Sequence, residues 1–300
     1  MISRRSFVGH ASAAVAYTAV SKHTALAQSP GLRLDLPLGL QLYSVREQLA
    51  RDYEGTLMQV GSCGYREVEA AGFYKKTAAE VKQDMQKANL KCVSAHFPFG
   101  QLQPDFDKIL AYTRELGVEY MICSSPGFQK PAAEGTSDHG RAMTLDDWRW
   151  NAEQFNLMGE KTRAVGIHFG YHNHVHEFKA IDGVVPYMEL LRITDPAKVT
   201  LELDCGWAVV GGFQPVELLR DHPNRFSLLH VKDFKVTPGA SAQEPAVTEL
   251  GRGSIDYRPI LRQAAKSQKI KHMFVEQEAF DMPYMESLKV DAAYMHSLKS

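Results

Sequence analysis

The chain has few cysteines, almost no net charge and no apolar run long enough for a membrane span, and each absence excludes a class of protein. Four cysteines are scattered among 300 residues without a Cys-x-x-Cys pair, which argues against a disulfide framework or a zinc knuckle. Lys and Arg total 34 against 35 Asp and Glu, a net charge of −1. Without a basic surplus or a basic run, no nucleic-acid partner is expected. The weakly apolar run near the N-terminus is too short for a permanent membrane span.

The first 27 residues have the layout of a targeting segment rather than of a folded element. Ser3–Phe7 contains the pair Arg4-Arg5, the apolar run Ala11–Val20 follows, and Ala25–Ala27 offers a small-x-small cleavage site. This layout resembles a twin-arginine export signal, a route for proteins that are exported already folded. We therefore expect a signal peptide over residues 1–27, cleavage near Ala27 and a periplasmic mature chain. The alternative is an amphipathic N-terminal tail.

Strand-like and helix-like segments alternate eight times along the rest of the chain. The expected strands are Leu38–Val45, Arg66–Ala71, Lys91–Phe97, Tyr120–Ser125, Gly166–His174, Val199–Trp207, Phe226–Asp233 and Met273–Glu278. Alternation at this spacing favours a parallel sheet. Eight repeats in a chain of this size predict an α/β fold, a single (β/α)₈ TIM barrel over residues 28–300, and no composition break marks a second domain.

Helix ends are marked by recognisable caps. Thr77-Ala-Ala-Glu80 and Thr144-Leu-Asp-Asp147 are capping boxes, and Gly117 ends a third helix. The expected helices cover residues 77–89, 105–116, 144–166, 187–192, 215–221, 256–267 and 284–298. The two longest insertions, Pro126–Met143 and Lys235–Gly253, follow the fourth and seventh strands. They are therefore expected at the carboxyl end of the barrel, where active-site loops gather, as lids over a pocket.

The sixth expected strand, Val199–Trp207, carries two acids on one face. Alternation along a strand places Glu202 and Asp204 together and sends Leu201 and Leu203 to the other face. Two buried carboxylates are costly unless a cation lies beside them. Two interpretations stay open at this point, a buried salt bridge and a metal ligand at the end of a strand.

Other strand ends carry the side chains that bind metals or transfer protons. In chain order they are His96, the run His172-Asn173-His174 with His176 and Glu177, then His230 with Lys232, and finally Glu276 with Glu278. A lone histidine on an apolar strand is usually a satisfied core residue, but acids and imidazoles on consecutive strand ends indicate a shared site. Mixed oxygen and nitrogen donors suit divalent Mn, Co, Zn or Mg rather than a thiolate site, and we expect Mn.

Several of these motifs resemble those of the sugar phosphate isomerase/epimerase family, the xylose isomerase-like barrels. The resemblance covers the mature chain and is carried by Leu38–Arg46, Gly64–Glu69, Tyr171–His174, Leu203-Asp204, His230–Asp233 and Phe274–Gln277. It implies a metal-dependent enzyme and assigns Asp204, His230 and Glu276 as ligands. In many relatives the fifth strand supplies a glutamate that is both ligand and base, but here Gly170 aligns with it. His172 or His174 is then the fourth ligand, and His172 is favoured.

The chemistry implied by the resemblance is proton transfer beside a carbonyl. A metal chelated by a hydroxyl and a neighbouring carbonyl makes the carbon-bound proton easier to remove, and an enediolate forms. The catalytic candidates are Glu276, Lys232, His174 and His96, and a nearby cation would lower the pKa of Lys232. Contacts with substrate are expected from Asn173, Trp207, Glu177 and Phe97. The plainer alternatives are a salt bridge for Lys232 and core packing for Trp207 and Phe97.

One enediolate leads to two reactions. Reprotonation makes the protein a divalent-metal-dependent sugar isomerase or epimerase, which is the activity we expect. The alternative is a lyase or hydratase that cleaves 3-keto-glycosides by β-elimination, and an outside alternative is a non-catalytic sugar-binding protein. Export and the absence of a phosphate-binding Gly-rich loop favour a non-phosphorylated sugar or keto-sugar. The number of subunits is left open, with a homodimer among the alternatives.

Overall fold

A computed structural model describes residues 34–130, 140–235 and 246–298. The expected signal peptide, residues 1–27, lies outside the described residues, as do parts of both expected lids. Among the described residues, no helix is both long and apolar enough to cross a membrane. These three ranges contain every helix and strand described below.

Eight parallel strands close into a barrel, as the alternating pattern predicted. They are β1 (Gly39–Gln41), β2 (Glu67–Ala70), β3 (Lys91–Pro98), β4 (Tyr120–Ser125), β5 (His168–His172), β6 (Val199–Asp204), β7 (Phe226–Val231) and β10 (His272–Val275). Their order around the barrel is β1-β10-β7-β6-β5-β4-β3-β2. Because all neighbours are parallel, every strand ends at the same mouth of the barrel.

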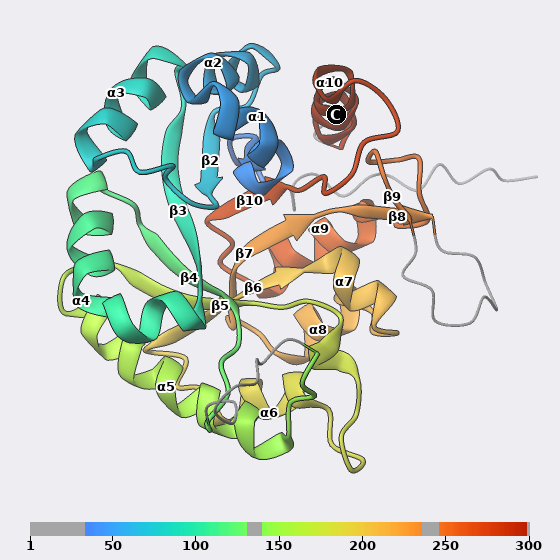
Figure 1. Cartoon of the computed structure of the whole chain (residues 1–300). Coiled ribbons are helices and arrows are strands. Elements are labelled where there is room, and N and C mark those ends of the chain that lie inside the picture. The colour runs from blue at the N-terminus through green and yellow to red at the C-terminus, as the bar shows by residue number, and fades with distance from the viewer. Residues whose placement is uncertain (1–33, 131–139, 236–245, 299–300) are drawn as a thin grey trace, which may run out of the picture. The chain divides into compact units, whose positions relative to one another are not determined.

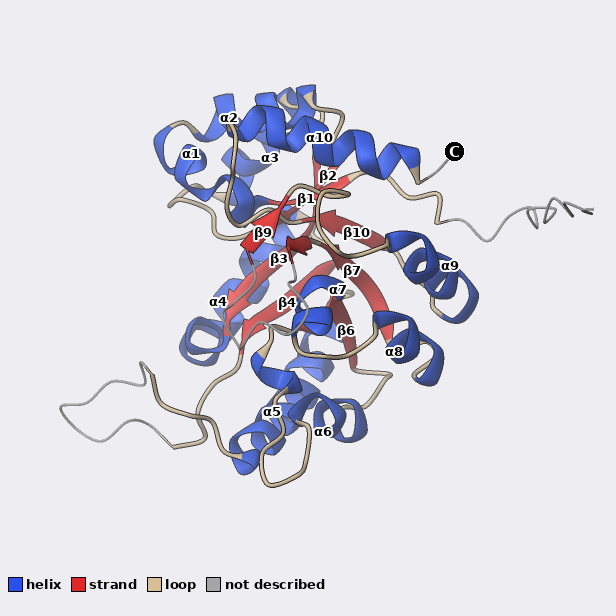
Figure 2. Cartoon of the chain, turned by 90° about the vertical axis from the view of Figure 1, so that its right-hand side faces the viewer, coloured by secondary structure: helices blue, strands red, loops and turns tan. Residues whose placement is uncertain are grey.

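Helices surround the strands on the outside (Figures 1 and 2). They are α1 (Arg46–Arg51), α2 (Tyr53–Ser62), α3 (Ala78–Lys87), α4 (Phe99–Leu116), α5 (Leu145–Arg163), α6 (Pro186–Ile193), α7 (Cys205–Val210), α8 (Pro215–Asp221), α9 (Tyr257–Ser267) and α10 (Tyr284–Ser297), with short 3₁₀ turns at Leu42–Val45 and His176–Phe178. Both predicted capping boxes are formed, at Thr77 and at Thr144. α4 begins earlier than expected and accommodates Pro104 by a kink at Asp105.

Six strands end earlier than the sequence pattern predicted, namely β1, β2, β5, β6, β7 and β10. β1 stops at Gln41 because a 3₁₀ turn follows, and β5 stops at His172. β6 stops at Asp204 because the Oδ1 atom of Asp204 accepts a hydrogen bond from the Trp207 N–H at 2.7 Å and so begins α7. β10 stops at Val275, directly before Glu276. The polar residues of the predicted site therefore lie within the last three residues of a strand or just beyond its end.

The segment after β7 contains a small antiparallel ribbon where only a loop was expected. β8 (Asp233–Lys235) pairs with β9 (Ala246–Thr248). The Asp233 carboxylate accepts hydrogen bonds from the N–H groups of Gly251 and Gly253 at 3.0 Å each, and of Ile255 at 3.1 Å. This buried side chain ties the returning segment to the end of β7.

Apolar side chains fill the barrel beneath its mouth. One buried cluster consists of Val93, Tyr120, Ile122, Leu228 and Phe274, all on barrel strands, and a larger one fills the space between the barrel and the helices. The barrel is thus a packed core rather than a pore. Above this layer, the strand ends leave room for polar groups.

Candidate metal centre and active site

The four predicted metal ligands come together at the mouth of the barrel. His172, Asp204, His230 and Glu276 are all buried, and their donor atoms lie within 4.8 Å of one another. Strand register explains the convergence, because Asp204 pairs directly with His230 across β6 and β7. The Nδ1 atom of His230 is 3.2 Å from Glu276 Oε2 and 3.9 Å from Asp204 Oδ2.

Asp204 presents a single oxygen to this cluster. Its Oδ1 atom is occupied by the helix cap described above, and its Oδ2 atom is buried without a hydrogen-bond partner. The nearest cationic group is the Lys232 ammonium, with Nζ at 3.4 Å from Oδ2. A buried carboxylate oxygen without a hydrogen-bond donor is costly, and a divalent cation among these four side chains would reduce that cost.

The balance of charge also fits a cation. Glu69, Glu202 and Asp204 have no exposed surface and Glu276 is 6 % exposed, so four carboxylates are withdrawn from water. Lys232 supplies one positive charge among them. Buried acids in excess require protonated imidazoles or a metal ion. With two imidazoles and two carboxylates, the four candidate ligands form a donor set suited to Mn, Co or Zn.

Lys232 lies on one side of the site among carboxylates. Its Nζ atom is 2.8 Å from Glu276 Oε2 and also contacts Glu278, and it lies 5.0 Å from the centre of the Trp207 ring. Burial lowers the pKa of Lys232, but the carboxylates of Asp204, Glu276 and Glu278 outweigh burial and raise it overall. In the protein alone, these acids therefore raise the pKa of Lys232, whereas a nearby cation was expected to lower it.

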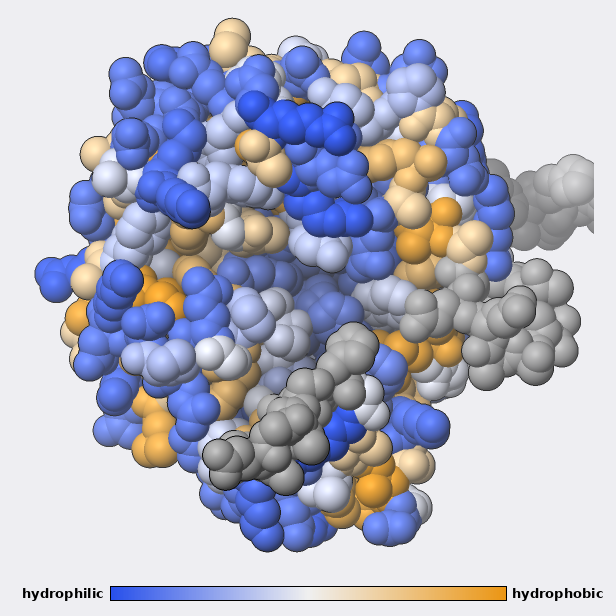
Figure 3. Space-filling model, viewed as in Figure 1, coloured by the Kyte–Doolittle hydropathy of each residue, from blue (hydrophilic) through white to orange (hydrophobic). Residues whose placement is uncertain are grey.

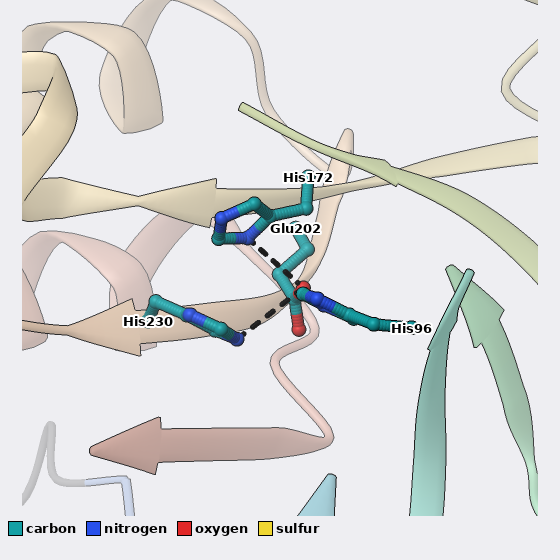
Figure 4. Close-up of side chains that lie close together, drawn as sticks. All are labelled: His96, His172, Glu202 and His230. Carbon is teal, nitrogen blue, oxygen red and sulfur yellow. Dashed lines mark hydrogen bonds and ion pairs between the residues drawn. The ribbon is translucent and has the colours of Figure 1, made fainter. Parts of the chain in front are cut away.

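Three imidazoles form the opposite side of the site around Glu202 (Figure 4). Glu202 Oε2 lies 2.6 Å from His96 Nε2, 3.2 Å from His172 Nδ1 and 3.4 Å from His230 Nε2. Burial lowers the pKa of His96, but Glu69 and Glu202 raise it to about 9. Burial and the neighbouring His230 instead lower the pKa of His172. A neutral His172 has the lone pair that a metal ligand needs.

On the fifth strand, Gly170 aligns with the ligand glutamate of many relatives, but His172 is the side chain that lies in the cluster. A Cβ atom at Gly170 would lie 2.6 Å from Ile122 Cδ1, within the apolar layer. A glutamate at Gly170 would therefore displace the barrel core. His172, two residues further along the same face, reaches the layer that holds Asp204 and His230.

Two other predicted residues lie beside the cluster. The His174 ring is 4.8 Å from the His172 ring and 6.3 Å from the Trp207 ring, measured between centres. Trp207 is buried and packs on Phe234 as well as under Lys232. Trp207 therefore combines core packing with a contact to the Lys232 side of the site.

Three predicted substrate contacts have other partners. Phe97 is buried and packs on Phe73, on the opposite face of β3 from His96. Glu177 is buried and accepts a hydrogen bond from the Tyr171 hydroxyl at 2.6 Å. Asn173 uses its amide on the backbone of Asp204. The structure does not bring these three side chains into the cluster.

Sequence reasoning gave no role to Glu69, Gln41 and Ser94, which the fold adds to the site. Glu69 Oε2 accepts from Gln41 Nε2 at 2.7 Å and lies 2.7 Å from His230 Nε2, while Glu69 Oε1 accepts from Ser94 Oγ at 2.6 Å. The available signal was alternation along Glu67–Ala70, which places a second acid on the inward face of that strand.

The surface is polar near the opening seen in Figure 3. On this face, hydrophilic residues surround a hollow near the middle, and hydrophobic residues are scattered around it. The described residues include few exposed large hydrophobic side chains, namely Tyr43, Met58 and Leu157. This face offers a recess for a polar molecule rather than an apolar docking surface.

The closed parallel barrel and the acid–histidine cluster at its strand ends define an α/β-barrel protein with a candidate divalent-metal centre. Residues 57–298 match the family model of the xylose isomerase-like TIM barrel. The chain belongs to this family, as its motifs implied.

Among curated relatives, the chain is similar to the inosose dehydratases of Lacticaseibacillus casei and Clostridium botulinum strain Alaska E43. Each is 24 % identical, over 246 and 250 residues, which cover 75 % of this chain and 82 % of the relative. A solved sugar phosphate isomerase/epimerase from Parabacteroides distasonis is 27 % identical, with a TM-score of 0.68, over 91 % of this chain and 97 % of that one. The IOLI protein, solved with a zinc atom, has a TM-score of 0.68 over 88 % of this chain and 98 % of its own at 12 % identity, and so shows the fold alone.

Proposed function

We propose that the protein is a metal-dependent lyase that eliminates a β-oxygen substituent from a non-phosphorylated keto-sugar or keto-cyclitol. The observation that carries this proposal is the chemical asymmetry of the site. A lysine and carboxylates form one side, and imidazoles around Glu202 form the other. Elimination needs a base on one side and an acid beside the departing oxygen. The similarity to inosose dehydratases supports this choice over isomerisation.

His172, Asp204, His230 and Glu276 would hold the metal, since their donor atoms converge and Asp204 Oδ2 has no hydrogen-bond partner. When bound, a divalent cation acts as a Lewis acid that polarises the ketone and acidifies the neighbouring carbon. We expect Mn, with Co, Zn or Mg as alternatives. Asn173 would not touch the substrate but would hold the backbone of Asp204.

The proton steps fall to the two sides of the site. The Glu276 carboxylate, paired with the Lys232 ammonium, takes the proton from the carbon beside the ketone, and the electrons of that C–H bond form the new C=C bond. The C–O bond one carbon further on breaks, and the oxygen leaves as water or an alcohol after receiving a proton from His96. Of the three imidazole side chains, His96 is 10 % exposed, whereas His172 is 2 % exposed and His230 is fully buried. His96 is therefore best placed to meet a molecule in the mouth, with His174 as the neighbouring alternative.

A sugar isomerase or epimerase is the second candidate, because carboxylates lie on both sides of His230. Glu276 Oε2 is 3.2 Å from Nδ1 and Glu202 Oε2 is 3.4 Å from Nε2. Two carboxylates on opposite sides could replace the pair that epimerases use. The 27 % identity to the Parabacteroides distasonis isomerase/epimerase supports this alternative.

Product analysis separates these activities. The purified protein is loaded with Mn and incubated in D₂O with a 3-keto-glucoside, and separately with an inosose, and the products are followed by NMR. An unsaturated ketone or its hydrate, with release of the alcohol or water, supports the lyase. Deuterium in an intact, inverted sugar would instead establish an epimerase. Binding of the keto-sugar without any conversion would indicate a sugar-binding protein.

We also propose that the chain is exported by the twin-arginine route to the periplasm. Support comes from the Arg4-Arg5 pair and the small residues before Gln28. Replacing both arginines by lysine should leave the precursor in the cytoplasm, while the unchanged chain appears as the cleaved form in the periplasm. Normal export of the lysine variant would refute this location.

A further inference from the structure

His230 has two ring nitrogens that face different groups. Nε2 lies 2.7 Å from Glu69 Oε2, whereas Nδ1 lies 3.2 Å from Glu276 Oε2 and 3.9 Å from Asp204 Oδ2. The ring is fully buried, so the partners of the two nitrogens decide where its hydrogen lies. Which nitrogen of a metal-binding histidine carries the hydrogen is commonly set by the group beyond it.

The surroundings of Glu69 make it an acceptor. Gln41 Nε2 donates to its Oε2 at 2.7 Å, and the Ser94 hydroxyl donates to its Oε1 at 2.6 Å. Glu69 is fully buried, and both oxygens are engaged by donors from β1 and β3. A carboxylate held in this way can only accept from His230. The hydrogen of the shared contact therefore belongs to Nε2 of His230.

We propose that Glu69 is a positioning residue that keeps the hydrogen of His230 on Nε2 and turns the lone pair of Nδ1 toward the metal centre. This inference rests on the proposed metal site. The lone pair of Nδ1 would face the carboxylates of Asp204 and Glu276, and only a cation or a proton between them removes that repulsion. A Glu–His–metal arrangement of this kind fixes the ring and raises its basicity as a ligand.

Glu67 provides a matched control on the same strand. It lies two residues before Glu69 on the same inward face, it is buried, and its Oε2 is 2.7 Å from His272 Nδ1. His272 begins β10, at the opposite end of the barrel from the cluster. Glu67→Gln and Glu69→Gln thus remove the same charge beside a histidine, and only the second contacts a candidate ligand.

The first test measures metal affinity in the purified full chain by competition with a chromophoric zinc chelator. Loss of such a partner commonly weakens binding by about 10- to 100-fold, and we expect a loss of that size for Glu69→Ala. Glu69→Gln should fall in between, since its amide oxygen can still accept from Nε2, and Glu67→Gln should match the unchanged chain. Equal affinities for all four proteins would overturn the proposal.

The second test observes His230 in the unchanged chain directly. Two-bond ¹H–¹⁵N NMR of the unchanged chain, with and without zinc, reports which nitrogen of His230 carries hydrogen, and His230→Gln assigns the signal. Hydrogen on Nε2 supports the proposal, and an Nε2 atom without hydrogen overturns it. If the unchanged chain binds no zinc, the proposed metal site fails, whereas an Nε2 atom without hydrogen in the zinc-free spectrum separately rules out the role of Glu69.

Discussion

Asn173 holds Asp204 through both backbone groups of that residue. The Asn173 Oδ1 atom accepts from the Asp204 N–H at 3.0 Å, and its Nδ2 atom donates to the Asp204 carbonyl at 3.2 Å. β5 has already ended at His172, so this side chain continues the pairing with β6 where no backbone can. The orientation of Asp204, with one oxygen on the α7 cap and the other toward the cluster, depends on that link.

We expect Asn173→Ala to lower metal affinity as well as stability. The substitution leaves two buried backbone groups unpaired, which costs about 1–3 kcal/mol each at most. Asn156→Ala is the control, because Asn156 bridges Ile193 O and Asp195 N at 3.1 and 2.7 Å at the far end of α6. Urea unfolding and zinc competition measure both effects. Loss of stability in both variants with equal loss of metal affinity would refute a specific role for Asn173.

Asp204→Asn should remove metal without unfolding the barrel. Asparagine caps a helix about as well as aspartate, so α7 keeps its cap, but the amide nitrogen in place of Oδ2 cannot bind a cation. Metal content by mass spectrometry should fall well below that of the unchanged chain. Asp52→Asn is the control, since Asp52 caps α2 by accepting from the Gly55 N–H at 2.9 Å. Full metal content in Asp204→Asn would place the site elsewhere.

A buried acid outside the active site should make stability depend on pH. Asp291 is fully buried, accepts from the Leu250 N–H at 2.8 Å through Oδ1, and has no hydrogen-bond partner for Oδ2. Burial, Glu249 and Asp233 raise the pKa of Asp291 from 3.8 to about 7, against the Leu250 N–H and Arg252, which lower it. The folded state therefore binds this proton more tightly than the unfolded chain does.

The sign follows from that difference. The stabilisation linked to the Asp291 proton is complete below the unfolded pKa and is lost as the pH rises through the folded pKa. Between about pH 5 and about pH 7, the free energy of unfolding should fall by up to about 1.4 kcal/mol per pH unit from this group. Urea unfolding across this range should show the fall in the unchanged chain and a smaller slope in Asp291→Asn. Identical slopes would contradict the assignment.

Parallel topology explains which parts of the site the sequence could predict. Asp204, His230 and Glu276 lie at or next to the ends of neighbouring strands, and the ends of parallel strands necessarily meet at one mouth of the barrel. The alternation rule also separates His96 from Phe97, so the position of Phe97 on the outer face was predictable from β3 alone. The sequence predicted strands that were too long where a side-chain cap begins a helix, as Asp204 does at the end of β6.

Glu69 could not be found in the same way, because its role depends on partners distant in the sequence. The donors to Glu69 meet only when β1 and β3 flank β2 and the closed barrel brings the end of β7 to the same mouth. Charge on an inward strand face is visible in the sequence, but Glu67 shares that pattern and lies beside His272 instead. Only the level of each residue along the barrel separates the two glutamates, and that level is set by strand register.

His96→Asn should separate proton abstraction from elimination. If His96 protonates the departing oxygen, its loss should leave the Lys232–Glu276 side able to exchange the carbon-bound hydrogen of a 3-keto-glucoside with D₂O. Release of a methoxy group should then fall by roughly 10²- to 10⁴-fold, the usual contribution of a general acid. Release of p-nitrophenolate should fall far less, because that group leaves without a proton.

The comparison needs both leaving groups and both readouts on the same Mn-loaded preparation, with metal content matched to the unchanged chain. His174→Asn is the parallel variant, since its ring lies beside His172 but outside the contacts with Glu202. A selective loss in His174→Asn would transfer the acid role to His174. If His96→Asn lowered deuterium exchange and both eliminations equally, His96 would not be the group that protonates the leaving oxygen. Another residue on the imidazole side would then have to be the general acid.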